Sequence, residues 1–252
     1  MPKKLSVKAP EPTDLVWGIH PVLESLKTNP SMVREVTVLK DRLPGRIDEI
    51  INLARQHNLR IQYVQDLPAA INKHVHQGVA ARLRLASPTT IEDILSRVKS
   101  ATAQPILLAL DCIQDPHNLG AIIRSAAAAG VIAILLPKDR SAPLSGTVAK
   151  ASAGALSHIP ICQVTNLVEA LKRLRDEGIW IYGAEKDTPI SLYQADFSGP
   201  VCLVVGSEGK GLRPLVKKQC DFLITIPMRG NLDSLNASVA TAIILFEIVR
   251  RQ

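Results

Sequence analysis

Apolar and polar positions alternate with two different periods along the chain, and these periods predict its helices and strands. Between residues 14 and 86 they predict a compact αβαβαβ unit, whose size suits a small separate domain. Its helices are expected at His20–Lys27, Ile47–Gln56 and, as a short piece, Leu67–Lys73, and its strands at Val33–Leu39, Ile61–Val64 and Gly78–Leu83. The Lys- and Pro-rich residues 1–13 before it are expected to form a flexible leader.

The second part of the chain, residues 105–252, alternates continuous apolar strands with helices. Such strands predict a parallel sheet covered by helices on both faces, so we expect an α/β protein. The strands are expected at Ile106–Leu110, Val131–Leu136, Ile159–Val164, Ile179–Gly183, Val201–Val205 and Phe222–Ile226. The helices are expected at Leu119–Ala129, Leu144–Ala151, Leu167–Glu177, Leu212–Lys218 and Ala237–Val249. Residues 87–104 are expected to be a linker containing a helix, Ile91–Lys99, that Thr89 or Thr90 caps.

The charge of the chain indicates an anionic partner. The net charge is +7, and residues 1–86 hold 13 Lys and Arg against 8 Asp and Glu, which is most of the excess. Aromatic residues make up only 3% of the chain, too few for stacking on the bases of a single strand. If the partner is RNA, we expect contacts to its phosphates and its shape to dominate.

Several classes of protein are disfavoured by the same sequence. The cysteines Cys112, Cys162, Cys202 and Cys220 lie far apart without metal-ligand spacing, so they are interpreted as buried thiols in a reducing cytosol. His74 and His76 have no Cys or His near them in sequence, and we expect no metal site. No secretory signal follows Met1, and no apolar stretch is long enough to span a membrane, so a cytoplasmic protein is expected.

Polar residues precede the apolar helix at the end of the chain. Ser234 and Asn236 lie directly before Ala237–Val249, where either side chain would cap the orphan N–H groups of the helix. Capping alone would explain such residues. A polar group at the start of a buried helix is also typical of a ligand-binding site, so both capping and ligand binding stay open as interpretations at this point.

A second motif runs from Asp115 to Ala126. Arg124 is the single charge between Leu119 and Pro137, and its neighbours are isoleucines and alanines. These neighbours suggest close packing all round the helix, in which case an arginine needs an anionic partner such as a phosphate. The alternative is a solvated charge on the helix surface. Asn118 precedes the expected helix and could serve merely as its cap.

A third motif, Gly206–Gly211, follows a buried strand and precedes a helix, which is the usual position of ligands in α/β folds. It is not a phosphate-binding Walker loop, because Gly211 and not Ser or Thr follows Lys210. Its glycine spacing is also the reverse of the dinucleotide motif. Glu208 would repel a phosphate, whereas it would attract a sulfonium cofactor or accept hydrogen bonds from ribose hydroxyls. A plain surface glutamate is the alternative.

In this order and spacing, the three motifs resemble those of the SpoU/TrmH family of RNA 2′-O-ribose methyltransferases, over residues 106–250. The resemblance implies S-adenosyl-L-methionine as cofactor, a deep trefoil knot in the C-terminal domain and a homodimer. It places the cofactor among the family positions matched by Gly206, Ile226, Leu235, Met228 and Ala184. The catalytic polar set is matched by Arg124, Asn118, Glu208, Ser234 and Asn236.

The N-terminal segments 17–22 and 76–80 resemble the corresponding segments of one branch of the family. Members of that branch methylate the ribose of a guanosine in large-subunit (23S) ribosomal RNA. The resemblance therefore implies that residues 14–86 form a ribosomal-protein-like αβ domain that binds the RNA. It leaves two roles open for Arg124, the proton acceptor or an electrostatic orienter with a water carrying the proton. A tRNA methyltransferase of the same family and a non-catalytic RNA-binding ribosome-assembly protein are the alternative functions.

Overall fold

The computed structural model describes residues 15–28, 30–41, 45–69, 71, 75–83, 89–230 and 234–252. The expected leader and His74 lie outside these residues. The chain divides into two compact units, one formed by Met1–Leu85 with Leu144–Gly146, the other by Ala86–Pro143 and Thr147–Gln252. No helix in the described part of the chain is both long enough and apolar enough to cross a membrane.

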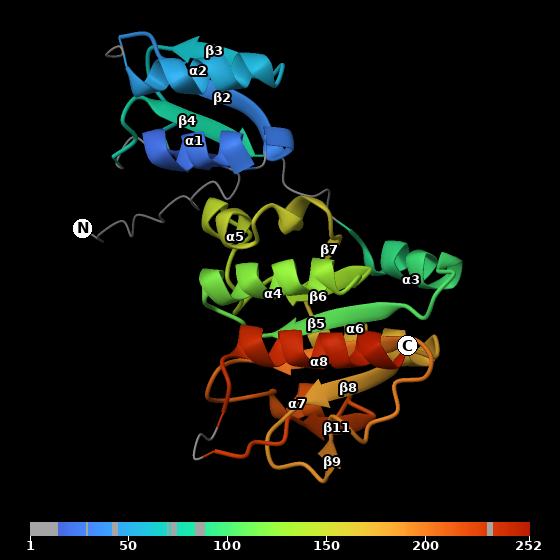
Figure 1. Cartoon of the computed structure of the whole chain (residues 1–252). Helices are drawn as coiled ribbons and strands as arrows, with labels where there is room; N and C mark the ends of the chain where they lie inside the picture. The colour runs from blue at the N-terminus through green and yellow to red at the C-terminus, as the bar shows by residue number, and fades with distance from the viewer. Residues whose placement is uncertain are drawn as a thin grey trace, which may run out of the picture. The chain divides into compact units, whose positions relative to one another are not determined.

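The first unit is a four-stranded sheet with helices packed on it, drawn in blue to green in Figure 1. The strand order is β1-β4-β2-β3, with β2 and β3 parallel and β4 antiparallel to both β1 and β2. Its elements are β1 (Leu15–Trp17), α1 (Ile19–Thr28), a 3₁₀ turn (Pro30–Met32), β2 (Val33–Leu39), α2 (Arg46–Gln56), β3 (Arg60–Val64) and β4 (Val79–Leu83). Fully buried Val22, Leu26, Val36 and Ile50 contribute to its core.

The first unit differs from its prediction at two places. The sequence did not indicate β1, whose three residues are too few to display a period of two. The short helix expected at Leu67–Lys73 is absent from the described residues of this stretch, so that prediction was wrong there: residues 67 and 68 have no regular structure, and residues 69 and 71 lie in a turn. The other residues of the stretch lie outside the described ones. Leu67 and Ile71 are nevertheless buried, in a cluster with Leu15.

The second unit contains a seven-stranded sheet in the order β7-β6-β5-β10-β8-β11-β9, and every pair of neighbouring strands is parallel. Its strands are β5 (Ile106–Asp111), β6 (Ala133–Pro137), β7 (Ile161–Val164), β8 (Trp180–Ala184), β9 (Ile190–Ser191), β10 (Val201–Gly206) and β11 (Phe222–Thr225). Its helices are α3 (Ile91–Ser100), α4 (Pro116–Ala128), α5 (Gly146–Ala151), a 3₁₀ turn (Ala155–Ser157), α6 (Leu167–Asp176), α7 (Pro214–Lys217) and α8 (Ala237–Arg251).

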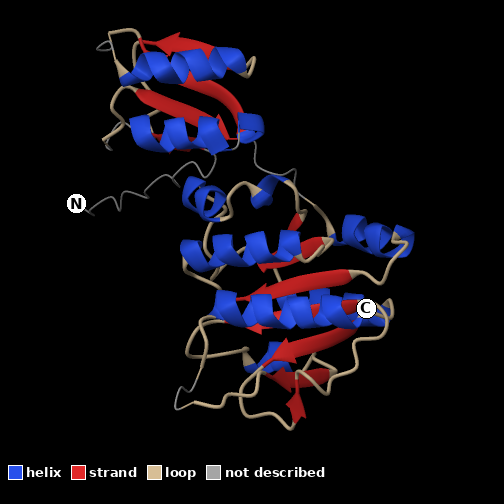
Figure 2. Ribbon diagram, viewed as in Figure 1, coloured by secondary structure: helices blue, strands red, loops and turns tan. Residues whose placement is uncertain are grey.

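Helices cover both faces of this sheet, as the continuous apolar strands predicted. In Figure 2, α4 and α8 lie in front of the strands, and the two helices pack against each other. On the other face, α3, α6 and α7 share one core cluster with alternate residues of the strands, such as Leu107, Leu135 and Cys202. Since α3 contributes Ile91 and Ile94 to that cluster, the segment expected as a linker packs with the second unit.

Three features of the second unit can be compared with the sequence prediction. Helix α4 begins at Pro116, three residues before the expected Leu119, because Asp115 caps it and proline is favoured at the first helical position. The two-residue strand β9 adds an edge to the sheet beside β11 that the sequence did not indicate. The capping of α3 was predicted correctly, since Thr90 accepts a hydrogen bond from the Asp93 amide and Asp93 accepts one from the Thr90 amide.

Candidate active site

Three segments that are far apart in the sequence surround one cavity at the carboxyl ends of β8, β10 and β11. They are residues 184–188, 205–211 and 224–228, and residues 234–237 at the start of α8 close the cavity together with Ala240 and Ile244. Its volume is about 910 Å³. Binding sites in parallel α/β sheets form at this edge, so the cavity lies where a ligand is expected.

Glycine residues shape the wall that follows β10. A side chain at Gly206 would place a Cβ atom 2.2 Å from the carbonyl carbon of Gly211, so only glycine lets the loop fold back on the strand. Reciprocal backbone hydrogen bonds between Ser207 and Gly211 close that loop, at 3.2 and 2.9 Å. Gly209 and Gly211 have φ of +77° and +63°, a region that favours glycine. The tight turn leaves Glu208 at the tip of the loop.

Glu208 joins two asparagines that come from distant parts of the chain. Its carboxylate Oε1 accepts a hydrogen bond from Asn118 Nδ2 and another from Asn236 Nδ2, the latter at 3.0 Å. Asn236 Nδ2 also donates to Asn118 Oδ1 at 3.0 Å. We call these three residues the polar triad. It brings together the first turn of α4, the glycine loop and the start of α8.

The two asparagines of the triad reach it from different positions in their helices. Asn236 is the N-cap of α8, and its Oδ1 accepts from the amides of Ser238 and Val239 at 2.8 and 3.4 Å. The capping interpretation is therefore correct for Asn236, but it accounts for only one end of the amide. Asn118 lies inside the first turn of α4 and does not precede or cap it, because Asp115 is the cap.

Arg124 lies away from the cavity, and one expectation about it was wrong. The close packing all round α4 that its neighbours suggested is absent: Arg124 is exposed, while Leu119, Ile122 and Ile123 are buried on another side of the helix. It makes no hydrogen bond or ion pair to any residue that the structure describes, and it does not line the cavity. Its guanidinium is thus available to an external anion.

The five residues expected to contact a cofactor all line the cavity, namely Gly206, Ile226, Leu235, Met228 and Ala184. Gly206 is buried, Met228 is 40% exposed, and the other three are half-buried. Ser234 also lines the cavity, whereas Asp233 lies outside the described residues. These residues give the cavity a mixed lining, with apolar side chains beside the carboxylate of Glu208.

Charged residues next to the glycine loop were missed by the sequence analysis. Asp111, at the end of β5, is fully buried and accepts hydrogen bonds from the backbone N and Nε of Arg213, at 2.8 and 2.6 Å. Glu185, directly after β8, lines the cavity and forms an ion pair with Lys217 at 3.4 Å. A charge at the end of a continuous apolar strand was the signal that would have found Asp111.

The cysteines offer no reactive thiol at this site. Burial raises the pKa of each of the four, to about 12 for Cys220, so all are protonated at neutral pH. Cys162 and Cys202 are buried as expected, but Cys112 and Cys220 are only half-buried. Within the described ranges, no group of three His, Cys, Asp or Glu residues is placed to hold a metal ion.

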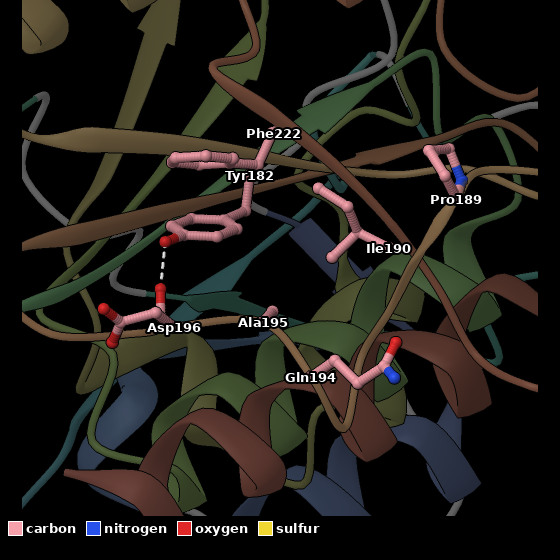
Figure 3. A pocket seen from close by; sticks show the side chains of 7 residues that line it. All are labelled: Tyr182, Pro189, Ile190, Gln194, Ala195, Asp196 and Phe222. Carbon is pink, nitrogen blue, oxygen red and sulfur yellow. Dashed lines mark hydrogen bonds between the residues drawn. The ribbon is translucent and has the colours of Figure 1, made fainter.

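A second, smaller cavity of about 360 Å³ lies beside β8 and β11 (Figure 3). Tyr182 and Phe222 stack on its wall at 5.0 Å between ring centroids, and the Tyr182 hydroxyl donates to the Asp196 carbonyl. Burial raises the pKa of Tyr182 to about 12, so this hydroxyl stays protonated. The lining carries no nucleophile or paired carboxylates, so we do not assign chemistry to it.

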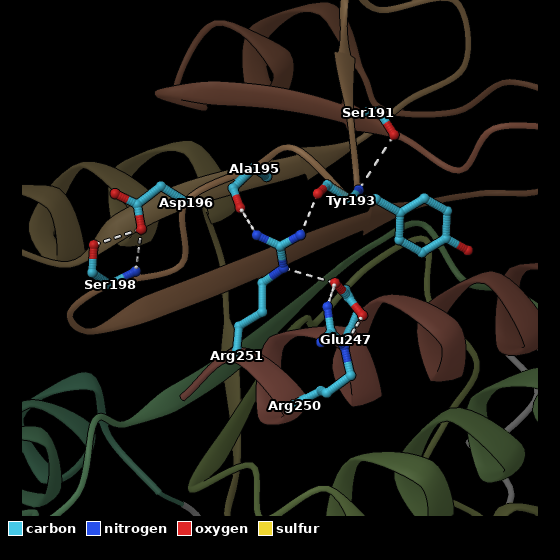
Figure 4. A network of polar contacts seen from close by, with 8 residues as sticks. All are labelled: Ser191, Tyr193, Ala195, Asp196, Ser198, Glu247, Arg250 and Arg251. Atoms are coloured by element: carbon cyan, nitrogen blue, oxygen red, sulfur yellow. Dashed lines mark hydrogen bonds and ion pairs between the residues drawn. The ribbon is translucent and has the colours of Figure 1, made fainter.

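The end of α8 is tied to the segment beside this smaller cavity. Arg251 donates to the backbone carbonyls of Ala195 and Tyr193 and also to Glu247, which Arg250 contacts as well (Figure 4). The hydrogen bonds from Arg250 and Arg251 lower the pKa of the Glu247 carboxyl to about 2. Helix α8 is thus fixed at both ends, by the polar triad at its start and by this network at its end.

Family models match both units of the chain. The model of the SpoU rRNA Methylase family matches residues 105–246. A model described as RNA 2′-O ribose methyltransferase substrate binding matches residues 15–89. The first match covers every segment that surrounds the larger cavity.

Whole-length relatives show the same similarity. The chain is 44% identical over 239 residues to the 23S rRNA (guanosine-2′-O-)-methyltransferase RlmB of Xanthomonas campestris pv. campestris, covering 94% of this chain and 96% of that protein. It is 42% identical over 242 residues to the RlmB of Escherichia coli K12, covering 95% and 99%. An AdoMet-bound rRNA methyltransferase from Sinorhizobium meliloti has a similar structure, with a TM-score of 0.66 at 25% identity, over 94% of this chain and 86% of that one.

Proposed function

Since the chain belongs to the SpoU rRNA Methylase family, we propose that it transfers a methyl group from S-adenosylmethionine to the ribose 2′-hydroxyl of a guanosine in 23S ribosomal RNA. The observation that carries the proposal is the convergence of Asn118, Glu208 and Asn236 at a cavity between the carboxyl ends of parallel strands. Because its substrate is ribosomal RNA, we place the enzyme in the cytoplasm.

The cavity fits S-adenosylmethionine in size and in chemistry. Its volume of about 910 Å³ lies in the range of small-molecule sites. Ile226, Leu235 and Ala184 supply apolar contacts for an adenosine, and the loop that folds back on Gly206 forms part of the wall. The lining carries three carboxylates and two lysines, so its net charge is negative and favours a cationic ligand. These residues are Glu185, Asp187, Glu208, Lys186 and Lys210.

The bound cofactor supplies an electrophilic methyl group on a positively charged sulfur. The residues of the chain have to align the ribose oxygen with that group, and alignment of two bound reactants lowers a barrier by about 7–11 kcal/mol. Asn118 and Asn236 hold the Glu208 carboxylate in one orientation by three mutual hydrogen bonds. We assign the triad, together with Ser234, to positioning the ribose at the mouth of the cavity.

Arg124 is assigned to the RNA side of the site. It lies six residues after Asn118 on α4, about 9 Å along the helix axis, and it is exposed without a partner among the described residues. A guanidinium in this place can bind the phosphate next to the target ribose by a forked contact. It either accepts the hydroxyl proton itself or orients the ribose while water takes the proton. The second role is favoured chemically, because a guanidinium stays charged unless strongly perturbed.

Residues 14–86 are assigned to RNA binding, and residues 105–252 to catalysis. The match of residues 15–89 to a substrate-binding family model supports the first assignment, as does the basic excess in that part of the chain. Ribosomal RNA is the partner that follows from the family.

We also propose that the enzyme is a homodimer formed through α8, with a trefoil knot beside the cofactor. Val239, Phe246 and Val249 leave apolar surface exposed on α8, at 47%, 50% and 40%, which a second copy would cover. The knot is proposed because the motifs that the chain shares with its family imply it. Sedimentation equilibrium checks the dimer, and an experimentally traced backbone through residues 226–237 checks the knot.

Methyl transfer from radiolabelled S-adenosylmethionine tests the proposed function directly. We expect label in the 23S rRNA of cells that lack this gene, at one guanosine ribose, and none in 23S rRNA that already carries the modification. Label in a tRNA ribose would move the chain to the tRNA branch of the family. RNA binding without incorporation of label would favour a non-catalytic role in ribosome assembly.

A further inference from the structure

Two charged pairs tie the segment after the glycine loop to the strands on either side of β10. In the sheet, β5 and β8 are the two neighbours of β10. Arg213, the N-cap of α7, reaches Asp111 at the end of β5, and Lys217, in the last turn of α7, reaches Glu185 just after β8. The segment that carries Glu208 is therefore anchored on both sides of its own strand.

The contact between Asp111 and Arg213 is the stronger anchor. Asp111 has no exposed surface, and each of its carboxylate oxygens accepts one hydrogen bond from Arg213, at 2.6 and 2.8 Å. A buried carboxylate is costly unless it is paired, so the position of Arg213 is tightly determined. The ion pair of Glu185 with Lys217 is longer, at 3.4 Å, and the Lys217 side chain is 43% exposed.

The anchored residues are close enough to determine where Glu208 lies. Between Arg213 and the loop stands only Leu212, which is 5% exposed and belongs to the core. Gly211 then hydrogen-bonds back to Ser207, the neighbour of Glu208. A shift at Arg213 therefore passes through a short, rigid stretch to the carboxylate that Asn118 and Asn236 bind.

We propose that Asp111 and Arg213 form a positioning pair that holds the glycine loop so that Glu208 completes the polar triad. The pair touches neither cofactor nor RNA, and it acts through Glu208, with Glu185 and Lys217 as a weaker second anchor. This inference rests on the proposed methyl transfer for its catalytic consequence. Its structural part, the ordering of the loop, is independent of that activity.

Hydrogen exchange in the cofactor-free full-length protein tests the structural part. In Arg213→Gln and Asp111→Asn, we expect faster exchange at the amides of Ser207 and Gly211, each of which donates to the carbonyl of the other residue across the loop. Arg173→Gln is the matched control, because it removes the exposed ion pair with Glu92 at 2.7 Å in the same unit. Unchanged protection of both amides in the folded Arg213 and Asp111 variants would overturn the proposal, whether or not the protein transfers methyl groups.

A double-mutant cycle with Glu208→Gln tests the catalytic part. At saturating S-adenosylmethionine, Arg213→Gln should lower the single-turnover rate by about 100-fold, the order expected for a small misplacement in an active site. Arg213→Lys should restore part of that lost rate, and it serves as the test variant if Arg213→Gln does not fold. In the Glu208→Gln background, the Arg213 change should cost little more. Additive losses would show that Arg213 does not act through Glu208.

Discussion

The side-chain amide of Asn236 performs two tasks with its two ends. Its oxygen accepts hydrogen bonds from the first turn of α8, while its nitrogen donates to Glu208 and Asn118. A capping residue is held in one orientation by its helix, so the donor at the other end is aimed at the triad without further support. The folding of α8 and the geometry of the site are thus coupled through one residue.

Substitutions at Asn236 should separate these two tasks. Asn236→Ala removes both and should lower the free energy of unfolding by about 0.5–2 kcal/mol, the usual cost of a lost cap. Asn236→Ser retains a capping oxygen but no amide donor, so it should keep most of the stability and still lose activity. Denaturant unfolding and single-turnover rates measure the two effects.

A matched control for these substitutions is Asn166→Ala at the start of α6. Asn166 caps that helix by accepting from Val168 and Glu169, and it does not line the cavity. Asn166→Ala should therefore lower the free energy of unfolding about as much as Asn236→Ala, without changing the methyl-transfer rate per folded molecule. If the activity of Asn236→Ala falls only as far as its folded fraction, capping is the whole role of Asn236.

Arg124 should be required for turnover and dispensable for the cofactor. Because its side chain is exposed outside the cavity, Arg124→Ala should leave the Kd for S-adenosylmethionine nearly unchanged while abolishing methyl transfer. Calorimetric titration and a single-turnover assay provide the two values. A wild-type rate in this variant would remove Arg124 from the chemistry.

At this scale the sequence revealed the members of the site better than their connections. Asn118, Glu208 and Asn236 were singled out by the resemblance of the three motifs to the family, whereas their local contexts alone left a helix cap or a surface glutamate open. Nothing in their spacing indicated that one amide both caps α8 and donates to the triad. Arg124 was misjudged because alanine and isoleucine neighbours fit a helix with one exposed side as well as a fully buried one.

At the scale of single elements, α8 links the larger cavity to the segment beside the smaller one. Its first residue follows the triad, and its last turn holds the network of Glu247, Arg250 and Arg251. Glu247 is only 8% exposed, so its charge depends on these two partners. The network also includes the carbonyls of Tyr193 and Ala195, which places the end of α8 against the segment after β9.

This network should contribute to stability in a pH-dependent way. The pKa of Glu247 is lowered from 4.5 to about 2 in the folded protein, so its contribution is complete above pH 4.5 and lost as the pH falls toward 2. We therefore expect Glu247→Gln to be less stable than wild type at pH 6, with the difference shrinking toward pH 2.5. Urea titrations of both proteins at several pH values measure this difference in the free energy of unfolding. A difference that stays constant across this pH range would contradict the stabilising role of the Glu247 charge.

The elements that the sequence failed to predict are the short ones. Strand β9 has two residues and exists because β11 offers it an edge, which no local pattern encodes. Leu67 and Ile71 are buried four residues apart, a spacing that resembles a helix, although Ala69 and Ile71 lie in a turn. The long strands and helices of the parallel sheet were predicted because several periods reinforce each other within each element.

At the scale of the whole molecule, the two units should separate cofactor binding from RNA binding. A chain of residues 89–252 keeps α3, whose Ile91 and Ile94 pack in the core, and every residue that lines the cavity. It should bind S-adenosylmethionine like the full chain. It should lose most of its affinity for RNA and show a weaker dependence on salt, because the more basic part of the chain is gone. Binding isotherms at several salt concentrations check this, and an unchanged salt slope would reassign RNA binding to the second unit.

The separation of RNA binding and catalysis between the two units also determines which RNA can be a substrate. Aromatic residues are only 3% of the chain, so base stacking contributes little and most RNA affinity has to come from phosphates held in a defined arrangement. A short unstructured oligonucleotide offers the target guanosine without that arrangement. We expect its kcat/KM to fall at least 100-fold below that of a folded 23S rRNA domain, while the Kd for the cofactor stays the same. The comparison is made with one guanosine in both contexts and with product mapped by nuclease digestion. Equal rates would mean that the catalytic unit reads the target nucleotide without help from the RNA fold.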